Sequence, residues 1–150
     1  MAGRRYSIDG QDTNTASTTI LGLTSTAAIR PAIYDLVSGS DATPADNAAE
    51  YNVQRYTAAG TATAVTPQAL DPGNPAATAT AGEAHTAEPT YTANAVLLNY
   101  MHNQRATFRW VAAPDGEIIL PATAANGAGV QVITVAGSAV NTGITIHYLE

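Results

Sequence analysis

The sequence predicts an all-β protein, built as an antiparallel β-sandwich or jelly roll. No stretch of the chain keeps a helical 3.6-residue apolar period through several turns. Short segments instead alternate apolar side chains with other side chains at a period of two, as strands do. Eight prolines and twelve glycines separate these segments. Many short strands divided by turn residues are typical of sandwiches and jelly rolls.

Each alternating segment is expected to form a strand. In chain order these segments cover residues 32–37, 50–58, 95–101, 105–112, 117–120, 130–135 and 144–149. The segment 50–58 mixes Tyr, Val and Thr with polar residues, which predicts a strand at a sheet edge. In 105–112, Phe108 and Trp110 share one predicted face and Arg109 lies on the other, the pattern of a half-buried strand.

The start of the chain departs from this pattern. Residues 1–28 are polar and rich in Thr, with only Ile20, Leu21 and Leu23 as apolar anchors. We therefore expect an extended N-terminal arm that folds against a neighbour or onto a surface. This interpretation leaves residues 29–150 to form the sandwich.

A second region also lacks the alternation. Residues 66–92 contain prolines at positions 67, 72, 75 and 89, and proline favours extended chain. We expect a long Pro-rich loop over 66–92. Such a loop is either functional or a surface excursion between the two halves of the sandwich.

Composition predicts a single domain, residues 1–150, with a thin hydrophobic core. Hydrophobic residues make up 45% of the chain, but 31 of them are Ala, and Leu, Ile, Val and Phe together number only 27. A small core is often supplemented by contacts between copies of a chain. The composition therefore favours a self-associating protein.

Several classes of function are excluded or disfavoured. The chain has no Cys, so disulfide frameworks and thiol catalysis are excluded. All six basic residues are Arg and the sequence pI is about 4.8, which argues against a nucleic-acid partner. Apolar runs such as 94–101 are too short to cross a membrane. The first residues lack the apolar stretch of a signal peptide, so we expect a soluble protein made in the cytoplasm.

Catalytic chemistry is not indicated by the residues. His85, His102 and His147 are far apart in the sequence and show no metal-ligand spacing. No nucleophile elbow of the Gly-x-Ser-x-Gly type is present. We expect no catalytic residue, no cofactor and no bound metal. A metal-dependent barrel enzyme that uses the three histidines is kept as an alternative.

Contact residues are predicted from the arginines and tyrosines. Arg4, Arg5 and Tyr6 lie on the expected arm, where they could meet a partner. Arg105 and Arg109 are expected on one face of a strand, either as an ion-pair site between subunits or as a solvated face. The chain has seven Tyr and one Phe, a bias typical of surfaces that meet a partner.

Several segments carry a resemblance to a known family. They are the run from Thr19 to Ile29-Arg30-Pro31-Ala32-Ile33-Tyr34-Asp35, then Val53-Gln54-Arg55-Tyr56-Thr57-Ala58-Ala59-Gly60, Leu70-Asp71-Pro72 and Gln104-Arg105-Ala106-Thr107-Phe108-Arg109-Trp110-Val111-Ala112. The chain resembles the head decoration, or cement, proteins of tailed phages over most of its length. The resemblance implies a jelly-roll homotrimer on the capsid surface of the virion that bridges major capsid proteins. It carries no catalytic motif.

A different class of function stays open beside this one. The chain could be a carbohydrate-binding or receptor-binding jelly-roll module of a phage tail or fibre. That role needs exposed aromatic side chains, and Tyr6, Tyr91 and Tyr100 are the residues expected to supply them. The sequence leaves open which face would meet a shell and whether the 66–92 loop takes part.

Overall fold

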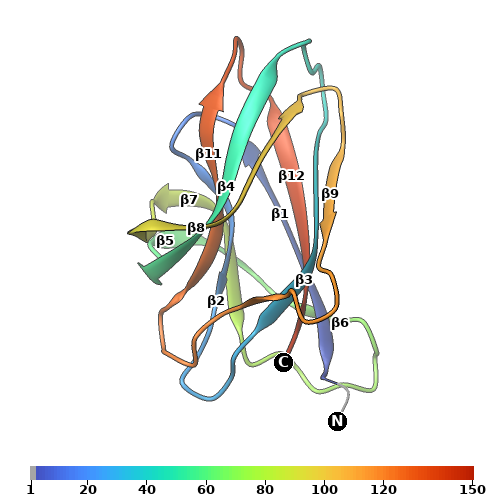
Figure 1. Cartoon of the computed structure of the whole chain (residues 1–150), viewed down its shortest axis with the longest axis vertical. Coiled ribbons are helices and arrows are strands. Elements are labelled where there is room, and N and C mark those ends of the chain that lie inside the picture. The colour runs from blue at the N-terminus through green and yellow to red at the C-terminus, as the bar shows by residue number, and fades with distance from the viewer. Residues whose placement is uncertain (1–2) are drawn as a thin grey trace.

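The computed structural model describes residues 3–150, which form two antiparallel β-sheets packed face to face (Figure 1). This arrangement confirms the predicted all-β sandwich. The strands are β1 (Arg5–Thr13), β2 (Thr19–Thr24), β3 (Ala32–Ser40), β4 (Ala48–Ala58), β5 (Thr61–Val65), β6 (Gln68–Ala69), β7 (Thr80–Ala87), β8 (Thr90–Asn103), β9 (Phe108–Val111), β10 (Ile118–Ile119), β11 (Gly127–Val135) and β12 (Asn141–Leu149).

Each sheet contains six strands. In sheet A the order is β10-β3-β12-β1-β6, and β9 also pairs with β3. In sheet B the order is β5-β7-β2-β11-β4-β8. The edges of sheet B are therefore β5 and β8, and the long strand β8 is hydrogen-bonded to a neighbour on one side.

The pairings between the two halves of the chain are nested. β1 pairs with β12, β2 with β11, β3 with β9 and β10, and β4 with β8. Successive strands from β1 to β4 alternate between the sheets, so the chain resembles one long hairpin wrapped around the core. The pairings β3–β12 and β4–β11 then join neighbouring arms of the hairpin within each sheet.

The core lies between the inner faces of the sheets and follows the period of two. On β12, Ile144, Ile146 and Tyr148 are buried while the residues between them are more exposed. Aromatic rings help to fill the space: Tyr100 of β8 stacks on Phe108 of β9, with ring centroids 4.2 Å apart. Because these strands belong to different sheets, this stack connects the two layers.

The prediction of an extended N-terminal arm over residues 1–28 is wrong, because this region contains the paired strands β1 and β2. Residues 1 and 2 lie outside the described part of the chain. β1 lies between β12 and β6, and β2 lies between β7 and β11. Tyr6 and Ile8 on β1 are 0% and 1% exposed. Their alternation with Ser7 and Asp9 was present in the sequence, but it is short and ends at Gly10.

The predicted loop over residues 66–92 contains more regular structure than expected. It holds β6, β7 and the start of β8, which leaves residues 70–79 as its irregular part. β7 pairs with β2 on one side and β5 on the other, and this backbone hydrogen bonding does not require large apolar side chains. The sequence signal of such an Ala-, Gly- and Thr-rich strand is correspondingly weak.

The remaining predicted strands are found, although the one expected over 105–112 covers only Phe108–Val111 and the one expected over 117–120 only Ile118–Ile119. Segments 32–37, 130–135 and 144–149 lie within β3, β11 and β12. The segment 50–58 forms most of β4, but it is not an edge strand because β11 and β8 flank it. Its polar residues face outward: Asn52 lies between the buried Tyr51 and Val53, and Gln54 follows Val53.

Candidate functional site

The outer face of sheet A carries a row of polar and aromatic side chains, which we call the arginine face: Arg5, Tyr34, Asp35, Arg109 and His147. Strand register brings them together, because Asp35 lies opposite His147 on one side and opposite Val111 on the other. His147 sits between the buried Ile146 and Tyr148, so its side chain faces outward.

Asp35 is the electrostatic centre of the arginine face. Its carboxylate accepts hydrogen bonds from Arg109 Nε (3.0 Å) and Arg109 Nη2 (2.7 Å), a bidentate ion pair. His147 Nδ1 lies 3.3 Å from the same carboxylate. Asp35 is only 4% exposed because these side chains cover it. The hydrogen bonds from Arg109 hold the pKa of the Asp35 carboxyl below its ordinary value, against the opposing effect of burial.

Tyr34 connects the two ends of the arginine face. Its ring stacks on His147, with centroids 6.1 Å apart, and the Arg5 guanidinium carbon lies 6.0 Å from its centroid. Burial raises the pKa of the Tyr34 hydroxyl. Among residues 3–150, no carboxylate lies within ion-pair distance of Arg5. Arg5 is therefore held over an aromatic ring with its charge available to a partner.

A surface pocket of about 440 Å³ adjoins the arginine face at Arg5 and Tyr34. The side chains that line it are mostly polar, namely Arg4, Arg5, Tyr34, Asp71 and Asn74, with Leu70 as the large apolar one. Leu70 is 49% exposed. The pocket thus combines positive charge, an aromatic ring and one apolar contact.

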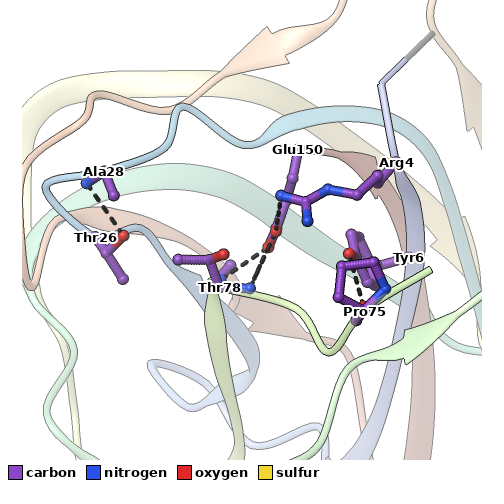
Figure 2. Close-up of polar contacts among 8 residues, drawn as sticks. Arg4, Tyr6, Thr26, Ala28, Pro75, Thr78 and Glu150 are labelled. Carbon is purple, nitrogen blue, oxygen red and sulfur yellow. Dashed lines mark hydrogen bonds and ion pairs between the residues drawn. The ribbon is translucent and has the colours of Figure 1, made fainter.

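The far wall of the pocket belongs to the irregular segment 70–79, which Glu150 holds in place. Figure 2 shows the Glu150 carboxylate between the Arg4 guanidinium and the backbone of Thr78. It accepts hydrogen bonds from the backbone N–H groups of Thr78 and Ala79, at 3.0 and 2.8 Å. The side chain of Glu150 is 0% exposed. The wall is therefore fixed by charge-assisted hydrogen bonds.

The structure brings together three of the five predicted contact residues. Arg4 and Arg5 line the pocket, and Arg109 lies on the same sheet face. Arg105 is not on a strand with Arg109, because it lies in the turn after β8, where its Nε donates to the Pro44 carbonyl at 3.2 Å. Tyr6 points into the core and donates its hydroxyl to the Pro75 carbonyl at 3.0 Å (Figure 2).

The three tyrosines predicted for glycan binding are buried or half-buried. Tyr6 is fully buried and Tyr100 is 4% exposed. Tyr91 is half-buried, and its hydroxyl lies 2.7 Å from Thr19 Oγ1. It packs edge-on against Tyr56, where burial raises the pKa of the Tyr56 hydroxyl to about 12. Of the aromatic residues discussed, Tyr34 is the one beside the pocket.

The three histidines lie in separate surroundings. His85 contacts the Thr19 carbonyl, His102 lies near Ser38 within the aromatic stack, and His147 belongs to the arginine face. Among residues 3–150, no group of three or more His, Asp or Glu side chains is placed to hold a metal ion. The guanidinium groups and the aromatic ring of the arginine face are chemically suited to contact charged or aromatic groups.

The sequence interpretation missed Tyr34, Asp35, His147 and Glu150 as members of the site. A signal was present for Asp35, because a carboxylate between Ile33 and Leu36 in a predicted strand needs a cationic partner if it is covered. Glu150 gave no such signal, since its partners are backbone groups more than seventy residues away.

Comparisons with protein-family models, curated proteins and solved structures found no match for this chain. Among residues 3–150, no helix is long and apolar enough to cross a membrane.

Proposed function

We propose that the chain is a decoration, or cement, protein of a tailed-phage head, which forms a homotrimer and bridges major capsid proteins on the virion surface. The resemblance of its segments to that family motivates the proposal. The nested strand pairing supports the jelly-roll part of it. Setting aside the inserted strands, the orders β1-β12-β3-β9 and β2-β11-β4-β8 are what a long hairpin gives when wrapped into two four-stranded sheets.

The observation that carries the proposal is the arginine face with its pocket. The chain has a net charge of −6, yet Arg4, Arg5 and Arg109 gather on or beside one sheet face. Arg4 and Arg109 are paired with carboxylates of the chain itself, and Arg5 is the one left for a partner. We infer that Arg5 and the pocket bind an acidic or mixed surface of the shell.

Retention on capsid shells tests this proposal. The probe is expanded, undecorated shells of the major capsid protein from the same virus, with bound chain measured by co-sedimentation at several salt concentrations. The wild-type chain is expected to bind and to raise the temperature at which the shells break. Arg5→Glu is expected to weaken binding about tenfold or more, most clearly at low salt.

Arg30→Glu is the matched control, because Arg30 is also exposed but lies in the connection between β2 and β3. It makes the same change of net charge at a residue that belongs neither to the arginine face nor to the lining of its pocket. Equal losses in both variants would show that total charge, and not this site, governs binding. Shells that retain no wild-type chain and gain no stability would remove the decoration proposal.

The pocket also favours the second function, a carbohydrate-binding or receptor-binding module of a tail or fibre. Tyr34 offers an aromatic ring, and Asp71 and Asn74 offer side-chain groups able to hydrogen bond with sugar hydroxyls. A glycan array tests it. Binding that is lost in Asn74→Ala, with no binding to shells, would favour this function over decoration.

A further inference from the structure

We propose that the free edge of β8 is the surface through which copies of this chain associate, by extending sheet B with a strand of a second copy. The inference rests on the self-association in the proposed function, but not on binding to a shell. It concerns the opposite sheet from the arginine face, so the two contacts do not compete for the same residues.

The first support is the length and position of β8. It contains 14 residues and lies at the end of sheet B, paired with β4. From Leu98 to Asn103 its register with β4 is uninterrupted, so this half is regular along its other side as well. The other edge strands are shorter, from two to five residues.

The second support is the absence of charged residues and proline from this edge. Exposed edges in soluble proteins usually carry charged residues or proline, which prevent another strand from adding. Residues 90–103 contain no Asp, Glu, Lys, Arg or Pro. The register of β8 with β4 shifts at three places between Thr90 and Leu98, so the part of the edge open to a further strand is the regular stretch from Leu98 to Asn103.

The third support is the exposed apolar surface beside this edge. Val96 is 42% exposed and Met101 is 64% exposed. Both face outward, since their partners on β4 are Gln54 and Glu50. Met101 also borders a surface pocket of about 280 Å³ whose other lining residues include Ala48, Val135 and Ala136. A strand added along β8 would cover these side chains.

A second copy is the occupant because the thin core favours contacts between copies, and this edge carries no charge that would repel an identical acidic chain. Two identical chains, each with a net charge of −6, repel one another over most of their surfaces. The β8 edge has no charge to repel, and its free backbone groups can pair with any strand in register. In a closed threefold assembly the contact is head to tail, so β8 of one copy meets a different surface of the next.

The test is the mass in solution, measured by light scattering over a range of concentrations. The wild-type chain is expected near three times 15.3 kDa. The double variant Val96→Lys/Met101→Lys is expected to dissociate, with a dissociation constant about tenfold higher or more, because lysines beside an edge oppose strand addition. The added lysines also lower the net negative charge, so general repulsion cannot explain a loss of association.

Val111→Lys is the matched control, because Val111 is 56% exposed on a strand of sheet A. It should leave the mass unchanged, and circular dichroism should show that every variant keeps the β-sheet fold. Hydrogen exchange gives a second readout: amides in 98–103 that face away from β4 should exchange more slowly in the wild-type assembly than in the double variant.

Two results would overturn the inference. The first is a double variant that associates as the wild type does, which leaves self-association intact but places it elsewhere. The second is a wild-type chain that is monomeric at every concentration, which also removes the homotrimer. The shell-binding assay reports on decoration separately in either case.

Discussion

Two tyrosines of the core, Tyr6 and Tyr148, differ in one hydrogen bond. Their rings stack with centroids 5.6 Å apart, and both are 0% exposed. The Tyr6 hydroxyl donates to the Pro75 carbonyl, whereas the buried Tyr148 hydroxyl has no partner among the described residues. The pair therefore separates the contribution of a hydroxyl from that of its ring.

Tyr6→Phe is expected to lower the free energy of unfolding by about 1 kcal/mol, because it leaves the Pro75 carbonyl without its donor. Tyr148→Phe removes a buried hydroxyl that makes no bond, so it should leave stability unchanged or raise it slightly. Urea unfolding at neutral pH measures both. Equal destabilisation by the two substitutions would contradict the assignment of the Tyr6 bond.

Asp35 makes the stability of the fold depend on pH. Its pKa in the folded chain is below the ordinary value of 3.8, so the carboxylate is ionised and bonded to Arg109 at neutral pH. The stability that this adds is present above the ordinary pKa and is lost as pH falls through the lowered one.

The melting temperature of the wild-type chain should therefore fall as pH is lowered below 4. Asp35→Asn should melt lower than the wild type at pH 7 and show a weaker dependence on pH in the acid range. Asp9→Asn, at an exposed position of β1, is the control and should keep the wild-type slope. Parallel curves for wild type and Asp35→Asn would refute the role of this ion pair.

At the scale of elements, close approach between strands depends on glycine at particular positions. A β-carbon at Gly127, the first residue of β11, would collide with the Leu23 carbonyl and with the ring of Tyr56. Gly143 on β12 has nothing within 4 Å of the same position. Gly127 and Gly143 therefore form a matched pair of test positions, one on a strand of each sheet.

Gly127→Ala is expected to destabilise the fold by about 1–3 kcal/mol, since Tyr56 or the β2 backbone must shift. Gly143→Ala should stay within about 0.5 kcal/mol of the wild type. Chemical denaturation measures the difference. Similar values for the two variants would show that the space around Gly127 is not limiting.

A strand was predictable from the sequence where its own residues show the alternation of apolar and other side chains. The alternation in β3, β11 and β12 identifies them because large apolar side chains recur every second residue. β7 was missed because it has no apolar residue larger than Ala, and its stability comes from neighbours on both sides. The sequence of β1 resembles an arm because its inward apolar side chains, Tyr6 and Ile8, are followed by Gly10, which interrupts the apolar alternation.

Parts of the site were predictable in the same sense. Arg4 and Arg5 were predicted as contacts from their place near the start of the chain and Arg109 from its place on a strand, and the structure has all three on or beside one sheet face. Their partners were not predictable, because Arg109 pairs with Asp35 and Arg4 pairs with Glu150, and both pairs are far apart in the sequence. Tyr6 points into the core, which its residue type alone did not indicate, and Arg105 lies in a turn instead of on the predicted strand face beside Arg109.

At the scale of the whole molecule, the nested strand pairing determines which sheet each surface described above belongs to. The outermost pair, β1 and β12, forms the middle of sheet A, so both chain ends reach the same end of the sandwich (Figure 1). The arginine face and its pocket lie on sheet A, near those ends. The β8 edge belongs to sheet B, so in the proposed assembly one sheet would meet the shell and the other would meet a second copy.

The pairing of β1 with β12 also has a consequence for the order in which the protein can be made and folded. Among the described strands β1 is synthesised first, and β12, which completes its side of sheet A, is synthesised last. Tyr6 and Ile8 therefore lack their β12 neighbours until that strand has been made, and sheet A cannot close before then. A chain that must wait in this way benefits from having few large apolar residues, because a nascent segment dominated by Ala and Thr adheres weakly to its neighbours.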